Sequence, residues 1–482
     1  MRTAARLTGR SPARGPRPRL LPSSRGDRWA LAAVAVLIAA AALTGGLLGL
    51  AGRPVHAPAA PLFGHVLPHA GPGTPAAIAV ALAVIRWGPP LAARLPWRRL
   101  LATAYAASVA WTFALALIDG PERGIADRLT TRFEYLAEVP RVTDILTMLR
   151  TFDSHIVEGS PDPWTTHVAG HPPGALLVFV ALDRLGLHGG AWAAIACALI
   201  GCLATAAVAG TLRALHDEPA ARAALPYLVL FPGAVWVGVS ADGLFAGVAA
   251  LAIALLAAGL ARSSPWRLIA AGAALAGCAY LSYGLILLAL PAAAVALTHL
   301  AGRHATPLGR TNVLSLLTWV LAGMAAVVVA MTLLGFSWWD GYHLVRERYY
   351  QGLASERPYG YWVWANLAAF CLSTGPIAAP VLRRIAGSSL LAGSLAVPFH
   401  RLTTRGAGVH GRVALLVAAF CAAALAADLS GMSKAEVERI WLPFAVWLPA
   451  AAVVLPGRDR RWWLTAQAVT ALLVNHLVLT AW

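Results

Sequence analysis

Residues 119–174 read DGPERGIADRLTTRFEYLAEVPRVTDILTMLRTFDSHIVEGSPDPWTTHVAGHPPG and form the longest polar interval in a chain that is otherwise almost continuously apolar. Nine of the chain's 21 carboxylates lie here: Asp119, Glu122, Asp127, Glu134, Glu138, Asp144, Asp153, Glu158 and Asp162. The spacing predicts helical pieces at 132–138 and 144–157, the second with an apolar face made by Ile145, Leu149, Phe152 and Ile156. Connections longer than about 15 residues are usually functional or disordered, and these apolar anchors argue against disorder. We therefore expect residues 119–173 to form an active-site loop whose helices lie on a membrane surface.

The composition places the chain in a membrane. Hydrophobic residues make up 59% of the sequence, charged residues make up 12%, and the mean hydropathy is +0.67. Such values are typical of an all-α, polytopic helix bundle in a lipid bilayer. The net charge of +17 would suggest nucleic acid for a soluble protein, but the arginines cluster between apolar segments, as they do in cytoplasmic loops. We therefore expect no nucleic-acid partner.

The apolar segments predict one membrane domain behind a basic arm. Residues 1–28 carry eight arginines among Pro, Ser and Gly and predict a disordered cytoplasmic arm, so that 29–482 form a single integral membrane domain. Spans of about 20 residues are expected near 29–52, 74–91, 100–118, 190–212, 223–239, 242–261, 266–283, 285–301, 313–335, 361–381, 412–427, 438–456 and 463–481. This count of about thirteen, plus or minus two, assumes that the shorter stretches 174–187 and 388–398 do not cross the bilayer.

The arginine clusters also predict the orientation. With the N-terminus in the cytoplasm, every cluster falls on the cytoplasmic side of the plasma membrane. The loops 119–173, 336–360 and 428–437 and the turn before Asp242 then lie outside. This crowding of acids on the outer side is either the ordinary counterpart of the arginine bias or the mark of an active site.

His171-Pro172-Pro173-Gly174 ends the polar loop where the chain becomes apolar again. Two prolines suit the first turn of a helix and make a rigid corner. His171 is then either a substrate-binding residue or a hydrogen-bonded interface residue at that corner.

A long extracytoplasmic loop with a carboxylate, a surface helix and a Pro-Pro corner resembles the GT-C superfamily, the glycosyltransferases that use polyprenyl-phosphate sugars. Protein O-mannosyltransferases and lipid A aminoarabinose transferases have a similar corner, and polyprenol-dependent mannosyl- and arabinosyltransferases of actinobacteria are similar in plan. The likeness covers residues 119–174 and, more faintly, LFPGAVWVGVSADGLFAG at 230–247, where Asp242 stands at a place similar to that of an acid in GT-C mannosyltransferases. The family's Asp-Glu pair after the first span is missing here, so no motif assigns the base.

The resemblance implies an inverting transfer of a sugar, such as mannose or another hexose or pentose, from a polyprenyl phosphate to an envelope glycan, glycolipid or protein. A carboxylate would take the proton of the acceptor hydroxyl, and cations would neutralise the departing phosphate. Glu134, followed by Tyr135 in FEYL, stands where GT-C proteins have an acid followed closely by Tyr, so Glu134 is the first candidate base and Tyr135 a substrate-binding candidate. Asp119, at the membrane boundary, is the second candidate base. Each acid could instead be a solvated or capping carboxylate.

Two further stretches mix aromatic rings with arginines. SWWDGYHLVRERYYQGLASERPYGYW (337–362) offers Trp339, Asp340, Arg346 and Arg348 as substrate-binding candidates. Flat rings suit sugars and arginine forks suit phosphate, although aromatic belts also occupy this level of a bilayer. DLSGMSKAEVERIWLPF (428–444) places Arg439 near the outer headgroups, as a phosphate ligand or as the capping partner of a glutamate.

The sequence leaves other functions open. Neither a DxD motif nor a histidine-rich cluster demands a metal, so we expect no cofactor, with a divalent metal left open. A transporter or flippase for a lipid-linked or polar solute is the main alternative, and a noncatalytic factor for envelope assembly is a third. Transporters usually hold their charges near the bilayer midplane in broken helices, whereas most acids here are expected in outer loops.

Overall fold

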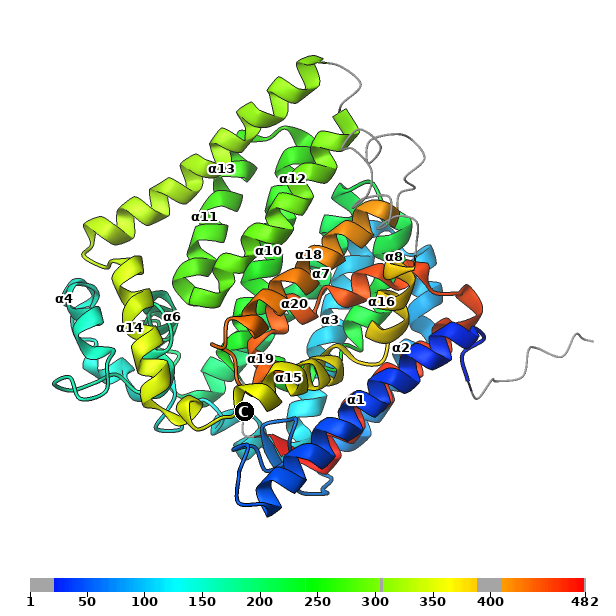
Figure 1. The fold of residues 1–482 in the computed structure, drawn as a ribbon. Helices are drawn as coiled ribbons and strands as arrows, with labels where there is room; N and C mark the ends of the chain where they lie inside the picture. The colour runs from blue at the N-terminus through cyan, green and yellow to red at the C-terminus, as the bar shows by residue number, and fades with distance from the viewer. Residues whose placement is uncertain (1–20, 239, 304–306, 388–409, 481–482) are drawn as a thin grey trace, which may run out of the picture.

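The structure is a computed structural model that describes residues 21–238, 240–303, 307–387 and 410–480 (Figure 1). Its longer helices are α1 (Arg25–Leu50), α2 (Gly73–Arg94), α3 (Trp97–Ala116), α7 (Gly190–Ala214), α10 (Ala241–Arg262), α11 (Pro265–Leu281), α12 (Ala289–Arg303), α13 (Pro307–Leu333), α15 (Tyr359–Thr374), α18 (His410–Leu429) and α21 (Arg460–Leu477). Shorter helices are α4 (Ile145–Thr151), α5 (Thr166–Ala169), α6 (Pro173–Arg184), α8 (Glu218–Val229), α9 (Ala234–Val237), α14 (Trp338–Gln351), α16 (Ala378–Ala386), α19 (Val437–Ile440) and α20 (Leu442–Ala445).

Tighter or wider helical turns and one small sheet complete the described chain. The 3-10 turns are η1 (Leu117–Asp119), η3 (Tyr135–Ala137), η4 (Val139–Arg141), η5 (Phe152–His155), η6 (Tyr283–Leu288), η7 (Leu353–Ser355), η8 (Leu448–Val454) and η9 (Gly457–Asp459), and η2 (Glu122–Ala126) is a π turn. Strand β1 (Gly64–Val66) pairs antiparallel with β2 (Val478–Thr480), with Gly64 opposite Thr480.

The all-α bundle and its membrane character are confirmed. Eight described helices are long and apolar enough to cross a bilayer, or nine if α15 and α16, which are bent by 111°, form one span. The other predicted spans fall on α11, on α21 and on the broken runs α8–α9 and α19–η8, so the count of about thirteen stays a prediction. Of the two stretches expected not to cross, 174–187 is the 12-residue α6, about 18 Å long. The other, 388–398, lies outside the described residues.

The breaks in the helices have a structural reason. Pro226 lies inside α8, and Pro449 is the second residue of the irregular η8. Both broken runs are buried in the middle of the bundle, where Trp236 and Trp447 are fully enclosed. Irregular backbone is tolerated at membrane depth only where protein surrounds it. The unbroken α1 and α13 lie at opposite edges of the bundle (Figure 1) and keep most of their surface exposed, as membrane-facing helices do.

The bundle has two chemically different ends. At one end, which we call the arginine-rich end, α1 begins, α2 finishes and α21 begins. Here Asp27 is 0% exposed and is bound by Arg383 and Arg384, each at 2.7 Å. The sequence placed Asp27 in a solvated arm, and the structure instead buries it at the start of α1; residues 1–20 of that arm lie outside the described part. The opposite end, which we call the loop end, holds the loop 119–174, the start of α10 and the β1–β2 sheet.

The long loop is structured, as predicted, but the first of its two predicted helices does not form. Residues 144–157 form α4 followed by η5, and the predicted apolar face is inside, with Leu149, Phe152 and Ile156 buried. The prediction of a helix at 132–138 is wrong, because Glu134 has extended backbone and only a 3-10 turn follows it. That extended residue turns its side chain into the bundle instead of along a helix surface.

The Pro-Pro corner begins a helix, as predicted. Pro173 is the first residue of α6. A Cβ on Gly174 would lie 2.4 Å from the carbonyl oxygen of Tyr280, so the glycine lets α6 press against the end of α11. This contact holds the end of the polar loop against the membrane helices.

Candidate functional site

The site is built around Arg439, which α19 carries into the middle of the loop end. Its guanidinium donates from Nη1 to Asp242 Oδ2 and from Nη2 to Glu436 Oε2, each at 2.5 Å. The charge of Arg439 is buried, and the two carboxylates compensate it. Arg439 is therefore a fixed cation that ties α10 to the turn before α19.

Asp242 owes its position to the start of α10. Ser240 is extended, and its Oγ donates to the carbonyl oxygen of Trp236 at 3.1 Å, which sets the corner between α9 and α10. Asp242 then falls in the first helical turn, where unpaired N–H groups and the helix dipole favour a negative charge. The faint resemblance around 230–247 had pointed to this acid.

The turn before α19 carries strain. Ala435 and Glu436 both have left-handed backbone, with φ of +68° and +63°, and such residues cost on the order of 1–3 kcal/mol each. The turn aims Glu436 at two arginines, because Arg357 Nη2 donates to its Oε1 at 3.0 Å. Burial would raise the pKa of Glu436, but the charges of Arg439 and Arg357 outweigh it and lower the pKa to about 2. Glu436 therefore stays ionised.

Glu134 and His167 complete the other side of Arg439. The His167 Nδ1 lies 2.9 Å from Glu134 Oε1, and its Nε2 lies 3.4 Å from Arg439 Nη2. A carboxylate accepts and a guanidinium donates, so the neutral tautomer with hydrogen on Nδ1 satisfies both contacts. His167 thus fixes one oxygen of the candidate base and leaves the second to other partners.

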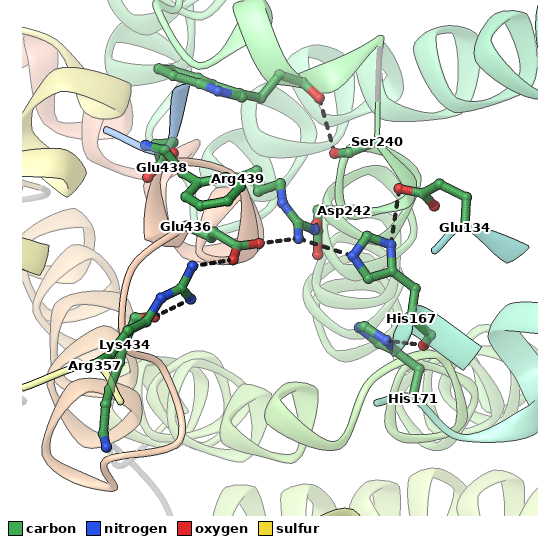
Figure 2. A network of polar contacts seen from close by, with 12 residues as sticks. Glu134, His167, His171, Ser240, Asp242, Arg357, Lys434, Glu436, Glu438 and Arg439 are labelled. Carbon is green, nitrogen blue, oxygen red and sulfur yellow. Dashed lines mark hydrogen bonds and ion pairs between the residues drawn. The ribbon is translucent and has the colours of Figure 1, made fainter. Parts of the chain in front are cut away.

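Figure 2 shows these contacts as one chain of dashed lines from Glu134 through His167, Arg439 and Glu436 to Arg357. We call the residues joined here the charged network: Glu134, His167, Asp242, Arg357, Lys434, Glu436 and Arg439. Three carboxylates face three cations in it, and its residues come from five separate stretches of the sequence, because Lys434, Glu436 and Arg439 lie together in one of them.

Lys434 and Arg357 form the cationic side of the network. Arg357 Nη1 donates to the carbonyl oxygen of Lys434 at 2.8 Å, and Lys434 Nζ donates to the carbonyl oxygen of Ala354 at 3.0 Å. Nζ also lies 5.1 Å from the ring centre of Tyr350. Burial and the charge of Arg357 lower the pKa of Lys434. Two adjacent cations that repel each other in this way make a favourable place for an anion.

Tyr135 and His171 support the network through ring contacts and a hydrogen bond. The Tyr135 ring stacks on Phe179, with centroids 5.0 Å apart, and stands edge-on to His171 at 5.8 Å. Burial lowers the pKa of His171 to about 4, so the neutral ring donates from Nδ1 to the carbonyl oxygen of His167 at 2.8 Å. The corner at 171–174 therefore positions the histidine that holds Glu134.

Glu438 lies one residue before Arg439 but serves a different contact. It is 0% exposed, and its Oε1 accepts from the backbone N–H of Phe63 at 2.8 Å. Its Oε2 has no hydrogen-bond partner within the described part of the chain.

The second candidate base, Asp119, lies in a different cluster. His69 Nε2 is 2.6 Å from its Oδ1, and Arg128 Nη2 donates to its Oδ2 at 2.5 Å. Arg128 also donates to the carbonyl oxygen of Thr480 on β2. Asp119 therefore fastens the start of the loop to the small sheet.

The candidates on α14 do not join the charged network. Trp339 is 62% exposed and stacks with Trp338, whose ring centre is 5.5 Å away. Asp340 is an exposed residue of the first turn of α14. Arg348 pairs with Glu158 of the long loop rather than with the network. Arg346 makes no side-chain hydrogen bond or ion pair with another described residue.

Sequence reasoning missed His167 as a site residue. The feature that could have indicated it is the pair of histidines at 167 and 171, which are one helical turn apart just before the Pro-Pro corner. Glu436 and Lys434 were visible as charges beside Arg439, but nothing in the sequence showed that Arg357 would meet them across 77 residues.

The described residues form no metal site, and no family is assigned to the chain. Among the described residues, no group of three or more His, Cys, Asp or Glu side chains could hold a metal ion. A scan against protein-family models gives no match for this chain, and a search of curated proteins gives none either. The resemblance to the GT-C superfamily therefore rests on the residues quoted above.

Proposed function

We propose that this protein is a GT-C-like glycosyltransferase that moves a sugar from a polyprenyl phosphate to an envelope acceptor at the outer face of the cytoplasmic membrane. The observation that supports this most is the pairing of Glu134 with His167 beside Arg439, in the loop that carries the family resemblance. A buried carboxylate held by a histidine, next to a group of cations, has the parts that an inverting transfer requires.

In the proposed step, the second oxygen of Glu134 takes the proton from the acceptor hydroxyl. The hydroxyl oxygen attacks the anomeric carbon, and the bond from that carbon to the donor phosphate breaks with its electron pair going to the phosphate. His167 keeps Glu134 Oε1 in place through the 2.9 Å contact. The products are the glycosylated acceptor, polyprenyl phosphate and the proton held on Glu134.

We propose Lys434 as the phosphate ligand, with Arg357 adding positive charge beside it. Arg439 was a candidate for this role, but its Nη1 and Nη2 already face carboxylates at 2.5 Å. A phosphate beside it would meet Asp242 and Glu436, and like charges at such distances repel strongly. Lys434 instead has an ammonium group with three donors, and one of them is given to the carbonyl oxygen of Ala354.

The proposed topology follows from the two ends of the bundle. The arginine-rich end would face the cytoplasm and the loop end the outside, with about thirteen crossings. A transporter is less well supported, because the charged network lies at the first turn of α10 rather than along the middle of a span.

The test is turnover of a lipid-linked sugar by the purified protein in vesicles. Polyprenyl phosphates carrying radiolabelled mannose, another hexose or a pentose are supplied with envelope glycan as the acceptor. We expect label in the glycan and release of polyprenyl phosphate with one of these donors, and neither with Glu134→Gln. Movement of the intact donor across the bilayer without loss of its sugar, equal in both proteins, would make the protein a transporter instead.

A further inference from the structure

The arginine-rich end contains a cavity that the proposed reaction does not use. It has a volume of about 500 Å³ and lies between the end of α2, the start of α8 and the start of α21. Its apolar wall includes Pro89, Pro226 and Leu464, and its polar wall includes Arg222 and Arg460. Figure 1 shows α2 and α8 close together at this side of the bundle, far from α14 and α4.

Prolines account for the space between these helices. Pro89 and Pro90 lie inside α2 and Pro226 lies inside α8, and a proline ring displaces the helical turn before it. Tyr227 bridges the gap below them, donating from its hydroxyl to the carbonyl oxygen of Arg460 at 3.1 Å. The cavity is therefore walled by rigid rings and by a tyrosine anchored to α21.

The charge at the cavity is positive. Its one acid, Glu218, is bound by Arg222 at 2.8 Å and by Arg213 at 3.1 Å, so two arginines offset one carboxylate. Arg222 is further held by the carbonyl oxygens of Ala92 and Leu95. Arg460 adds a further positive charge to the cavity wall, and its buried Nε has no hydrogen-bond partner in the described ranges. A buried donor without an acceptor is costly, and a phosphate oxygen would supply the acceptor.

The surroundings indicate where that phosphate comes from. The cavity lies at the end where the arginines gather, which is the level of the inner-leaflet headgroups in the proposed orientation. Anionic headgroups bind basic pockets between transmembrane helices on the cytoplasmic side. The apolar proline and leucine wall suits the glycerol and upper acyl carbons of such a lipid.

We propose that this cavity binds the phosphate headgroup of an anionic phospholipid, held by Arg460, with Arg222 adding positive charge beside it. The site is separate from the charged network, and this proposal does not depend on the proposed glycosyltransferase activity. The lipid would join the three helices at this end of the bundle.

The test compares lipids by thermal unfolding of the full-length protein in neutral detergent. Phosphatidylglycerol should raise the melting temperature by at least about 2 °C more than phosphatidylcholine of the same acyl chains, because a ligand of the folded state alone adds stability. Arg460→Gln should lose this preference. Arg458→Gln is the matched control, since Arg458 is exposed and bonds Ser23 outside the cavity, and it should keep the preference.

A second measurement separates binding from folding. Native mass spectrometry should find phosphatidylglycerol retained by the wild type and by Arg458→Gln, and lost from Arg460→Gln. Equal effects of the two lipids on the wild type, or a preference that survives in Arg460→Gln, would overturn the proposal. A full shift produced by soluble glycerol phosphate would also overturn it, in favour of a soluble phosphate ester.

Discussion

Two clusters at the loop end contain the same three kinds of side chain and use them differently. In the first, Asp119 is central, and both of its oxygens are taken, by His69 at 2.6 Å and by Arg128 at 2.5 Å. In the second, His167 is central, between Glu134 and Arg439. A carboxylate with both oxygens already bound is a poor base, whereas a carboxylate held at one oxygen by a histidine can still accept a proton. The arrangement of the three groups, rather than their identity, distinguishes a clamp from a candidate base.

The largest effect expected from this comparison is on activity at Glu134. A general base contributes roughly 10² to 10⁴-fold in rate, so Glu134→Gln should lower sugar transfer by that factor while the protein still accumulates in the membrane. Glu122→Gln is the control on an acid of the same loop and should transfer normally. Normal transfer by Glu134→Gln with a dead Asp119→Asn would exchange the roles of the two clusters.

The next effect is on stability at Asp119. Asp119→Asn leaves Arg128 buried beside a neutral amide, and breaking a buried pair costs about 3–5 kcal/mol. The melting temperature of the purified protein should fall. Transfer per folded molecule should stay within about twofold of the wild type, because the proposed general base, Glu134, is unchanged. A variant with an unchanged melting temperature and lost transfer would contradict the assignment of Asp119 as a clamp.

The smallest effects are expected on α14. Arg348 pairs with an exposed Glu158, and surface pairs contribute about 1 kcal/mol or less, so Arg348→Ala and Arg346→Ala should change the donor KM by less than about threefold. Lys434→Met, in the charged network, should raise the donor KM by more than about tenfold, as loss of a charge-assisted contact does. The opposite ranking would return the phosphate site to α14.

The fold class could be predicted from the sequence, because apolar segments between arginine clusters leave few alternatives in a bilayer. The helix start at Pro173 and the buried face of residues 144–157 followed from local rules of the same kind. The prediction of a helix at 132–138 was wrong, because local spacing does not show that the Glu134 side chain turns inward to contact His167.

The candidate site could be predicted only in pieces. Glu134, Asp242 and Arg439 were each chosen from separate stretches, and the structure brings them together. Their grouping, and the addition of Arg357, depends on how the turn at 435–436 is bent, with two residues in left-handed backbone. The sequence has no glycine at 435–436 that would indicate such a bend.

The most direct test of the difference between the two clusters is a double-mutant cycle of Glu134→Gln and His167→Ala, measured as sugar transfer per folded molecule. Residues that act as a unit are not additive. If His167 acts only by holding Glu134, the double variant should be as slow as Glu134→Gln alone, and His167→Asn, which can keep a donor near the Nδ1 position, should recover part of the rate. Losses that multiply in the double variant, or transfer near the wild-type rate in Glu134→Gln, would contradict the account.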